Sequence, residues 1–440
     1  MAPRISIIGG GPGGLTLGRL LHSHAIPFKI YDLRKEPTEA DLSLPSGMLD
    51  LHEESGLAAL RACGLYDKFL QRKAECSEAQ KVADRDGEIL YRDEGELSER
   101  PEISRDALTR LLAEGLPGGC IVWDRKLRSA EVSSSSSLSE ETEKEKEKEK
   151  DKVEIELDFG PHGKETCDLV IGADGAWSRV RDLLTDTKPH YAGTQSITAT
   201  ITDITSRYPH LAEFVGQGSF SALGMRHGVM SQRGPRDSAR IYVFLSLPDE
   251  HFASSSSSSV DRADTAAAAI TKERLLTDES LLGQWGARVK ELVSVAIDEE
   301  ISNANNDINP ADSNEIPIRP LYTLPIGTSW PPHSNATLVG DAAHLMCPWA
   351  GEGVNLAMWD ALLLSEAIST AYEATKNDPG SYSFIRELNP RLAQFEVDLV
   401  ARAKEKAEET YGNGQMMFGE DGAKAFTEFF LSAYGEGVNE

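Results

Sequence analysis

Cysteine, long apolar runs and positive charge are all scarce in this 440-residue chain. The five cysteines are scattered and none has C-x-x-C spacing, so we expect neither a disulfide framework nor a structural metal. That pattern suits a reducing compartment, and we expect a cytoplasmic protein. No stretch of about 20 apolar residues occurs, so no transmembrane segment is expected. The net charge of -26 argues against nucleic acid as a partner, because phosphate binding needs clustered lysine and arginine.

Signatures of catalytic side chains are also missing. The sequence has no G-x-S-x-G and no H-E-x-x-H, which mark nucleophilic serines and catalytic zinc. We therefore name no catalytic residue and no metal ligand. With 40% hydrophobic residues the chain can still bury a substantial core, and its length suits two or three domains.

A glycine-rich turn, GGGPGG, follows a short apolar strand near the N-terminus and opens a helical segment. Gly9, Gly11 and Gly14 satisfy G-x-G-x-x-G, whose glycines allow a tight turn, close approach to a pyrophosphate and close helix–strand packing. The first N–H groups of the helix would point at the phosphates. A flexible glycine turn is the alternative reading, but the strand before it and the helix after it favour a dinucleotide site.

Asp32 ends the next predicted strand, about 20 residues after the turn, where a carboxylate can accept hydrogen bonds from ribose hydroxyls. Arg34 and Lys35 stand close by and could instead pair with a 2′-phosphate. On these residues alone, FAD and NAD(P) both fit.

A second motif, CDLVIGADG, places Asp174 and Gly175 just after an apolar strand. Small residues at the carboxyl end of a strand let a ligand approach the backbone at the edge where α/β sheets bind their ligands. An ordinary Asp-Gly turn would give the same letters, so this motif has little weight by itself.

A third motif begins with LVGDAAH, in which Gly340 and Asp341 end another strand and the aspartate can hold polyol hydroxyls. Gly351 and Gly353 then open a long helix, whose unpaired N–H groups suit an anion such as a pyrophosphate or a reduced flavin ring. For His344 we favour a simple packed or surface histidine.

In this order and spacing, the three motifs resemble the class A flavoprotein monooxygenases, the group that includes p-hydroxybenzoate hydroxylase. They are most similar to the tetracycline-inactivating monooxygenases and their fungal relatives. Agreement extends to SGMLDLHEESG, PEISRDALTRLL and IVWDRKL. It covers most of the chain and thins out over residues 131–152 and about 251–315.

The resemblance implies an α/β protein with a Rossmann-type FAD-binding domain, a mixed β-sheet substrate domain and C-terminal helices. We expect the FAD-binding domain to comprise 1–75, 92–183 and 319–370, the substrate domain 76–91 and 184–318, and the C-terminal helical segment 371–440. The serine run and Glu/Lys alternation of 131–152 predict a disordered insertion.

The resemblance also implies roles for individual residues. The ADP half of FAD would lie on the first motif and Asp32, the ribityl chain near Arg105 and Asp341, and the isoalloxazine over the start of the last helix. The expected cofactor residues are Gly9, Gly11, Gly14, Asp32, Arg105, Asp174, Gly175, Gly340, Asp341, Pro348, Gly351, Gly353, Val354 and Asn355. The expected substrate residues are Met48, Thr198, Ser221, Arg240 and Trp349.

Two positions depart from the family pattern. Glutamate is commoner than aspartate at the place of Asp32, and Cys347-Pro348-Trp349 stands where relatives often carry Pro-Pro-Phe. The equivalent aromatic in the family lies between flavin and substrate. Trp349 could do the same, or it could simply pack the loop against the core.

The implied activity is a monooxygenase that consumes NADPH or NADH and O₂. It would insert one oxygen atom into an aromatic or polyketide-like small molecule through a flavin C4a-hydroperoxide. The reductant would bind transiently, since no second G-x-G-x-x-G is present. A flavin oxidase or reductase on the same fold is the main alternative, and a non-catalytic dinucleotide-binding protein is another. The missing W-x-W-x-I-P disfavours a halogenase. We expect a monomer or weak oligomer.

Overall fold

The computed structural model describes residues 2–38, 41, 46–72, 79–95, 102–133, 153–252, 268–304, 315–378 and 380–434. The predicted disordered insertion therefore lies outside the described residues from 134 to 152. Its first residues are ordered, since Glu131 and Val132 complete strand β8. Cys76 also lies outside, and the other four cysteines are free thiols.

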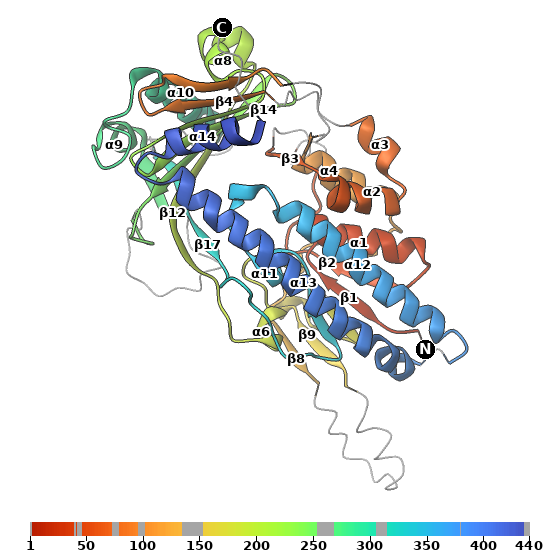
Figure 1. Cartoon of the computed structure of the whole chain (residues 1–440). Helices are drawn as coiled ribbons and strands as arrows, with labels where there is room; N and C mark the ends of the chain where they lie inside the picture. Colours follow the sequence, from red (N-terminus) through yellow and green to blue (C-terminus); the bar gives the residue numbers. More distant parts are fainter. Residues whose placement is uncertain are drawn as a thin grey trace.

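A five-stranded parallel sheet forms the centre of the first unit (Figure 1). Its strands are almost wholly apolar, as expected for a parallel sheet covered on both faces. The order is β18 (Ala336–Leu338), β11 (Leu169–Gly172), β1 (Ile5–Ile8), β2 (Phe28–Tyr31) and β7 (Ile121–Val122). All of these pairs are parallel, so their carboxyl ends lie at one edge.

Helices and a small antiparallel sheet enclose this parallel sheet. Helix α1 (Pro12–Ser23) packs against α12 (Gly353–Ala374) and against α4 (Arg105–Ala113). The small sheet has the order β10 (Lys164–Cys167), β9 (Ile155–Asp158) and β8 (Ser129–Val132). Tyr31 of β2 stacks on Phe159, which follows β9, with 4.7 Å between ring centroids. One apolar core joins all of these elements.

The shorter elements of this unit connect or cap the larger ones. Strands β3 (Met48–Asp50) and β6 (Glu102–Ser104) pair with each other. The others are the π-helix η2 (Glu53–Leu57), α2 (Ala58–Ala62), α3 (Tyr66–Leu70), the 3-10 helix η3 (Gly160–His162), α6 (Arg181–Leu184), α11 (Asp341–His344) and the 3-10 helix η4 (Pro348–Ala350).

An eight-stranded mixed sheet forms the second unit. Its order is β16 (Ala268–Thr271), β17 (Glu315–Thr323), β12 (His190–Ile201), β15 (Ser238–Ser246), β14 (His227–Gly234), β13 (Ser219–Gly224), β4 (Gln80–Asp84) and β5 (Ile89–Asp93). One face buries a second core against α8 (Pro209–Val215), α9 (Lys272–Thr277) and α10 (Ala287–Ala304), and α7 (Ile204–Arg207) precedes α8. The boundary predicted after residue 318 falls inside β17, which pairs with β12 and β16 of this sheet. The proposed division into domains stays a prediction.

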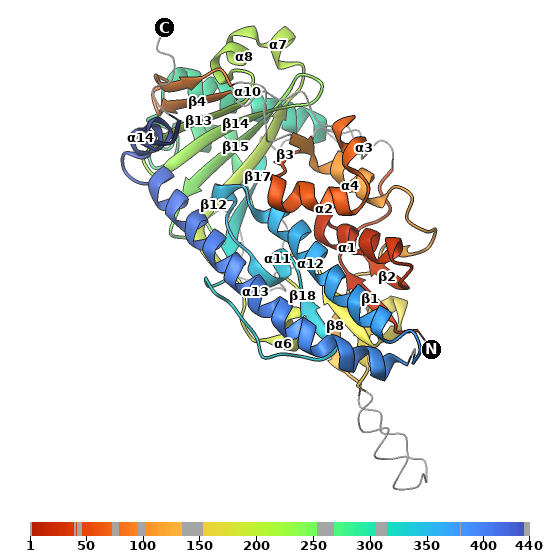
Figure 2. The same ribbon diagram turned by 45° about the vertical axis from the view of Figure 1, so that its right-hand side comes forward.

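The C-terminal helices join the two units. Helix α13 (Ser381–Met417) is 37 residues long and runs beside α12 toward the larger sheet (Figures 1 and 2). It leads into α14 (Gly422–Tyr434), which packs on β4, β5 and β13. Among the described helices none is both long and apolar enough to cross a membrane. The predicted fold class is confirmed, including the mixed second sheet and the C-terminal helices.

Candidate functional site

Strand register brings the three sequence motifs to one edge of the parallel sheet. Ile8 of β1 lies beside Tyr31 of β2 and Gly172 of β11, and Gly172 lies beside Leu338 of β18. Each motif begins within two residues of this row. Because all of these strands are parallel, Asp32 and the three glycine-containing turns must share one edge, where open α/β sheets bind ligands.

Glycines pack the first motif against the second and leave an opening above the helix. A Cβ at Gly9 would lie 2.1 Å from the carbonyl oxygen of Ala173, and one at Gly14 would lie 2.0 Å from that of Gly9. Any side chain at either position would therefore clash with backbone. At Gly11, which precedes helix α1, a Cβ would meet nothing within 4 Å. This opening at a helix N-terminus suits a pyrophosphate.

Asp32 is buried and its carboxylate is fully occupied. It is 3% exposed and accepts the Gly10 N–H at 2.7 Å and three N–H groups of Arg34 at 2.8 to 2.9 Å. Burial alone would raise the pKa of Asp32, but the hydrogen bonds and charge of Arg34 outweigh it and hold that pKa below its usual value. In this structure Arg34 pairs with Asp32, and the alternative pairing of Arg34 with a 2′-phosphate stays untested.

The second motif is shaped by its own hydrogen bonds. Asp174 accepts the Ser178 hydroxyl at 2.5 Å and the Arg179 N–H at 2.8 Å, and burial raises its pKa. Gly175 has a φ of +78° and an open Cβ position. Arg181 is 1% exposed and donates to the carbonyls of Ala176 and Ala342, which ties the second motif to the third.

The third motif places Asp341 where Arg105 can act on it. The Asp341 side chain is accessible to solvent, yet enough protein surrounds it that desolvation raises its pKa. The charges of His344 and Arg105 oppose this rise. Arg105 is the exposed first residue of α4, whose N-cap Ser104 accepts the Ala107 N–H at 3.2 Å. Two residues separated by 236 positions in the sequence are thus electrostatic neighbours.

A buried ion pair lies directly beneath the third motif. Asp360 of α12 is 1% exposed and contacts His344 Nε2 at 2.6 Å, the Gly340 N–H at 3.1 Å and Arg402 of α13 at 3.4 Å. Burial alone would lower the pKa of His344, but Asp360 raises it above its usual value. His344 is therefore buried in an ion pair, which agrees with the packed reading and excludes a surface position.

The start of α12 exposes backbone atoms, while the side chain of Asn355 forms hydrogen bonds within the protein. Gly351 has a φ of +69°, and a Cβ at Gly353 would meet nothing within 4 Å. Asn355 is fully buried, accepts the His52 N–H at 2.9 Å and donates to the Asp50 carbonyl at 2.9 Å. Only the backbone of Asn355 is free to meet a ligand. Val354 packs on the core, and Pro348 is exposed on η4.

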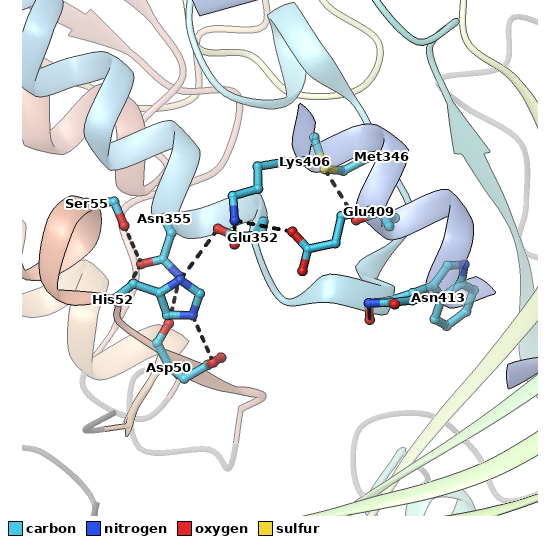
Figure 3. A network of polar contacts seen from close by, with 11 residues as sticks. Asp50, His52, Ser55, Met346, Glu352, Asn355, Lys406, Glu409 and Asn413 are labelled. Carbon is cyan, nitrogen blue, oxygen red and sulfur yellow. Dashed lines mark hydrogen bonds and ion pairs between the residues drawn. The ribbon is translucent and has the colours of Figure 1, made fainter. Parts of the chain in front are cut away.

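Between the two glycines, Glu352 lies in a chain of charged groups (Figure 3). It is 7% exposed and pairs with Lys406 of α13 at 2.6 Å and with His52 at 3.5 Å. His52 also contacts Asp50 at 3.3 Å. The hydrogen bond to Asp50, with a second to Glu352, raises the pKa of His52 to about 9. Lys406 continues the chain to Glu409 at 3.2 Å.

One face of the larger sheet lies toward these motifs and carries a set of neighbouring side chains on adjacent strands. Register places Thr198, Tyr242, Met230 and Ser221 side by side on β12, β15, β14 and β13. The residues next to them along each strand point into the second core on the opposite face. A Cβ at Gly47 would lie 3.0 Å from the Tyr242 hydroxyl, so this face meets the segment that carries Met48.

The expected substrate residues therefore lie on or beside one face, with different surroundings. Thr198 is half-buried and Ser221 is 6% exposed. Arg240, in the next row, bonds to the Thr200 hydroxyl at 2.5 Å. Met48 is 7% exposed and approaches Gly234 at the end of β14. Their contact with a substrate stays a prediction.

Trp349 packs in an aromatic cluster that links the loop before α12 to the larger sheet. Its ring lies 4.7 Å from that of Phe244 on β15 and 4.7 Å from that of Phe418 after α13. Its carbonyl accepts Asn413 at 3.3 Å, and a Cβ at Gly414 would lie 2.8 Å from the indole. These contacts support structural packing, the alternative that the sequence left open.

Sequence reasoning missed several residues of the site. Tyr242 could have been found, because alternation in ARIYVFLSL places it on the same face as Arg240 and Phe244. Asp360, Glu352 and Lys406 carry no local signal, since their importance comes from packing between α12 and α13.

Comparison with known proteins supports the family resemblance that the three motifs indicated. The pattern of a family described as an FAD binding domain matches residues 3–288 and 333–393. The monooxygenase penA of Penicillium thymicola is 34% identical over 96% of this chain and 96% of its own length. Klebsiella pneumoniae HpxO, solved with FAD and uric acid, has a TM-score of 0.66 and 17% identity, covering 98% of this chain and 94% of HpxO.

The tetracycline destructase Tet(55) superposes with a TM-score of 0.59 and 15% identity over 95% of this chain and 97% of its own. At such identities the two solved structures show the fold alone. The match along the sequence is what shows the family. The chain belongs to the FAD-binding monooxygenase family that the motifs indicated.

Proposed function

We propose that this protein uses NAD(P)H and O₂ to insert one oxygen atom into an aromatic or polyketide-like small molecule. The observation that supports this most is the convergence of three glycine-lined turns opposite a row of uncharged side chains on a second sheet. A cofactor bound at the turns would face a substrate held by the sheet.

The residues present fit FAD. Open Cβ positions at Gly11, Gly175 and Gly353 leave room at three points of the sheet edge, and two of them adjoin helix N-termini. The ribose hydroxyls would replace the Arg34 guanidinium as donors to Asp32, and Asp341 with Arg105 would meet the ribityl and phosphate region. The flavin supplies hydride acceptance and oxygen activation. The hydroperoxide route, the choice of NADPH or NADH, the cytoplasmic location and the oligomeric state stay predictions.

The substrate face favours an uncharged, planar molecule. Thr198 and Ser221 offer hydroxyls, while Tyr242 and Met230 offer aromatic and thioether surface. A surface with this mixture of side chains would hold a ligand by apolar area and use its few polar groups for orientation. Desolvation raises the pKa of Tyr242, so its phenol stays protonated at neutral pH and can donate a hydrogen bond.

The test uses the purified yellow protein with NADPH and a panel of aromatic and polyketide-like compounds. We expect a substrate that accelerates NADPH consumption and acquires one ¹⁸O atom from ¹⁸O₂. Flavin turnover that yields only hydrogen peroxide with every compound would instead assign an oxidase or reductase. Protein that folds but cannot be reconstituted with FAD would refute the cofactor assignment itself.

A further inference from the structure

Two cations one turn apart on α13 meet two buried carboxylates, one in α12 and one at its N-cap. Arg402 lies 3.4 Å from Asp360, and Lys406 lies 2.6 Å from Glu352. The carboxylates are 1% and 7% exposed. Residues four apart on a helix share one face, so this face of α13 carries both charges.

Of the two carboxylates, Glu352 would affect the charge of a bound flavin more, because it lies at the N-terminus of α12. It is the residue before the first turn of α12 and lies between Gly351 and Gly353. The N-terminus of a helix favours negative charge on a ligand, and a reduced flavin carries such charge. An uncompensated carboxylate here would repel that charge and cancel the benefit of the helix.

The structure compensates Glu352 from both sides. Lys406 reaches it from α13, and His52 reaches it from the segment after β3 (Figure 3). Asp50 in turn faces His52, and Glu409 faces Lys406. Burial alone would raise the pKa of Glu352, but His52 and Lys406 hold it below its usual value. The carboxylate therefore stays ionised and paired.

We propose that Lys406 is a positioning residue that neutralises Glu352 and thereby raises the reduction potential of the bound flavin. This inference rests on the proposed function, in which the flavin lies at the start of α12. It assigns a task to the C-terminal helix that neither the motifs nor the family pattern assigns. Lys406 acts through Glu352 and needs no contact with substrate.

Four variants test the charge balance. Lys406→Met leaves the Glu352–Lys406 pair with one negative charge, and Glu352→Gln leaves it with one positive charge. The double variant restores a net charge of zero, as in the wild type. Lys406→Arg keeps the charge. Lys404→Met is the matched control, because Lys404 is 56% exposed on the same helix and pairs with Glu408.

The measurement is the flavin reduction potential, together with FAD content and melting temperature. For Lys406→Met we expect the affinity ratio of reduced to oxidised flavin to fall on the order of tenfold, about 30 mV for a two-electron couple. Glu352→Gln should shift the potential upward by a similar amount. The double variant, Lys406→Arg and Lys404→Met should all lie near the wild type.

The outcomes distinguish a failure of this inference from a failure of the proposed function. Opposite shifts in the single variants, restored in the double variant, support the inference. Normal FAD content with equal potentials, or shifts of one sign in both single variants, overturns it and leaves the proposed function intact. A lower melting temperature and FAD content without opposite shifts of the reduction potential would indicate a purely structural role for Lys406 and would also overturn the inference. Wild-type protein that binds no FAD would overturn the proposed function and this inference together.

Discussion

Replacing Asp360 by asparagine should destabilise the protein strongly while changing its shape very little. The carboxylate is 1% exposed and accepts from Gly340, His344 and Arg402. An amide has one acceptor oxygen and one donor group. If its oxygen takes the place of Oδ2, its NH₂ faces the Arg402 guanidinium. If it is reversed, the NH₂ faces the Gly340 N–H.

Removing one partner from a buried ion pair typically costs about 3–5 kcal/mol, because the other charge stays buried and unpaired. His344 can release its proton in the variant, so we expect the lower end, about 3 kcal/mol. For a cooperative unit of about 150–250 residues this corresponds to a melting temperature lower by roughly 6–12 °C.

The assay is thermal melting of Asp360→Asn beside Glu366→Gln, which removes an exposed carboxylate from the same helix. The pH dependence adds a second check. Asp360 raises the pKa of His344, so the ion pair contributes fully below the ordinary histidine pKa of about 6.5 and is lost as pH rises through the raised value. The difference in melting temperature between wild type and Asp360→Asn should therefore become smaller at high pH. A shift no larger than that of Glu366→Gln would refute the reasoning.

Three further substitutions test other parts of the site. Asp341→Ala should weaken FAD binding about 10- to 150-fold, the loss of a charged acceptor worth about 1.5–3 kcal/mol, and unchanged affinity in a titration of apoprotein would remove Asp341 from the site. Trp349→Ala should cost about 3 kcal/mol of stability and part of the bound FAD, because its ring is packed against Phe244 and Phe418; normal melting with increased hydrogen peroxide would assign it to the substrate wall instead. His52 has a raised pKa of about 9, so its stabilising contribution should be present at neutral pH and lost as pH rises through that value. The melting temperature of His52→Asn should therefore fall less than that of the wild type as pH rises through this range. Identical dependence of melting temperature on pH in the two proteins would contradict the pairing of His52 with Asp50 and Glu352.

The sequence could predict the sheet edge because its signals are local. A glycine turn after an apolar strand requires only neighbouring residues, and parallel pairing then brings all such turns together. The predicted convergence of Gly9, Asp174 and Asp341 is therefore a consequence of strand order. The family match adds the second sheet and the C-terminal helices.

The rest depends on contacts between distant segments. Asn355 was expected to offer its backbone N–H to the cofactor, which stays a prediction, and its side chain holds the backbone of residues 50 and 52. Nothing near Asn355 in the sequence indicates that partner, which lies 303 positions away. Arg240, whose expected contact with a substrate stays a prediction, bonds to Thr200, a neighbour across the sheet. Such pairings follow from register and helix packing, which a single sequence leaves undetermined.

The buried charges beneath the third motif need an explanation beyond stability. Desolvating an ion pair costs about as much as its attraction returns, so apolar side chains of similar size would pack at least as well. The Asp360–Arg402 and Glu352–Lys406 pairs thus contribute little net stability compared with a leucine-rich contact. They do fix geometry, since Asp360 holds the Gly340 N–H and Glu352 stands before the first turn of α12. Positioning the loop and balancing its charge is a use that apolar packing could not provide, and it gives α13 a part in the proposed cofactor site although none of its residues belongs to a cofactor motif.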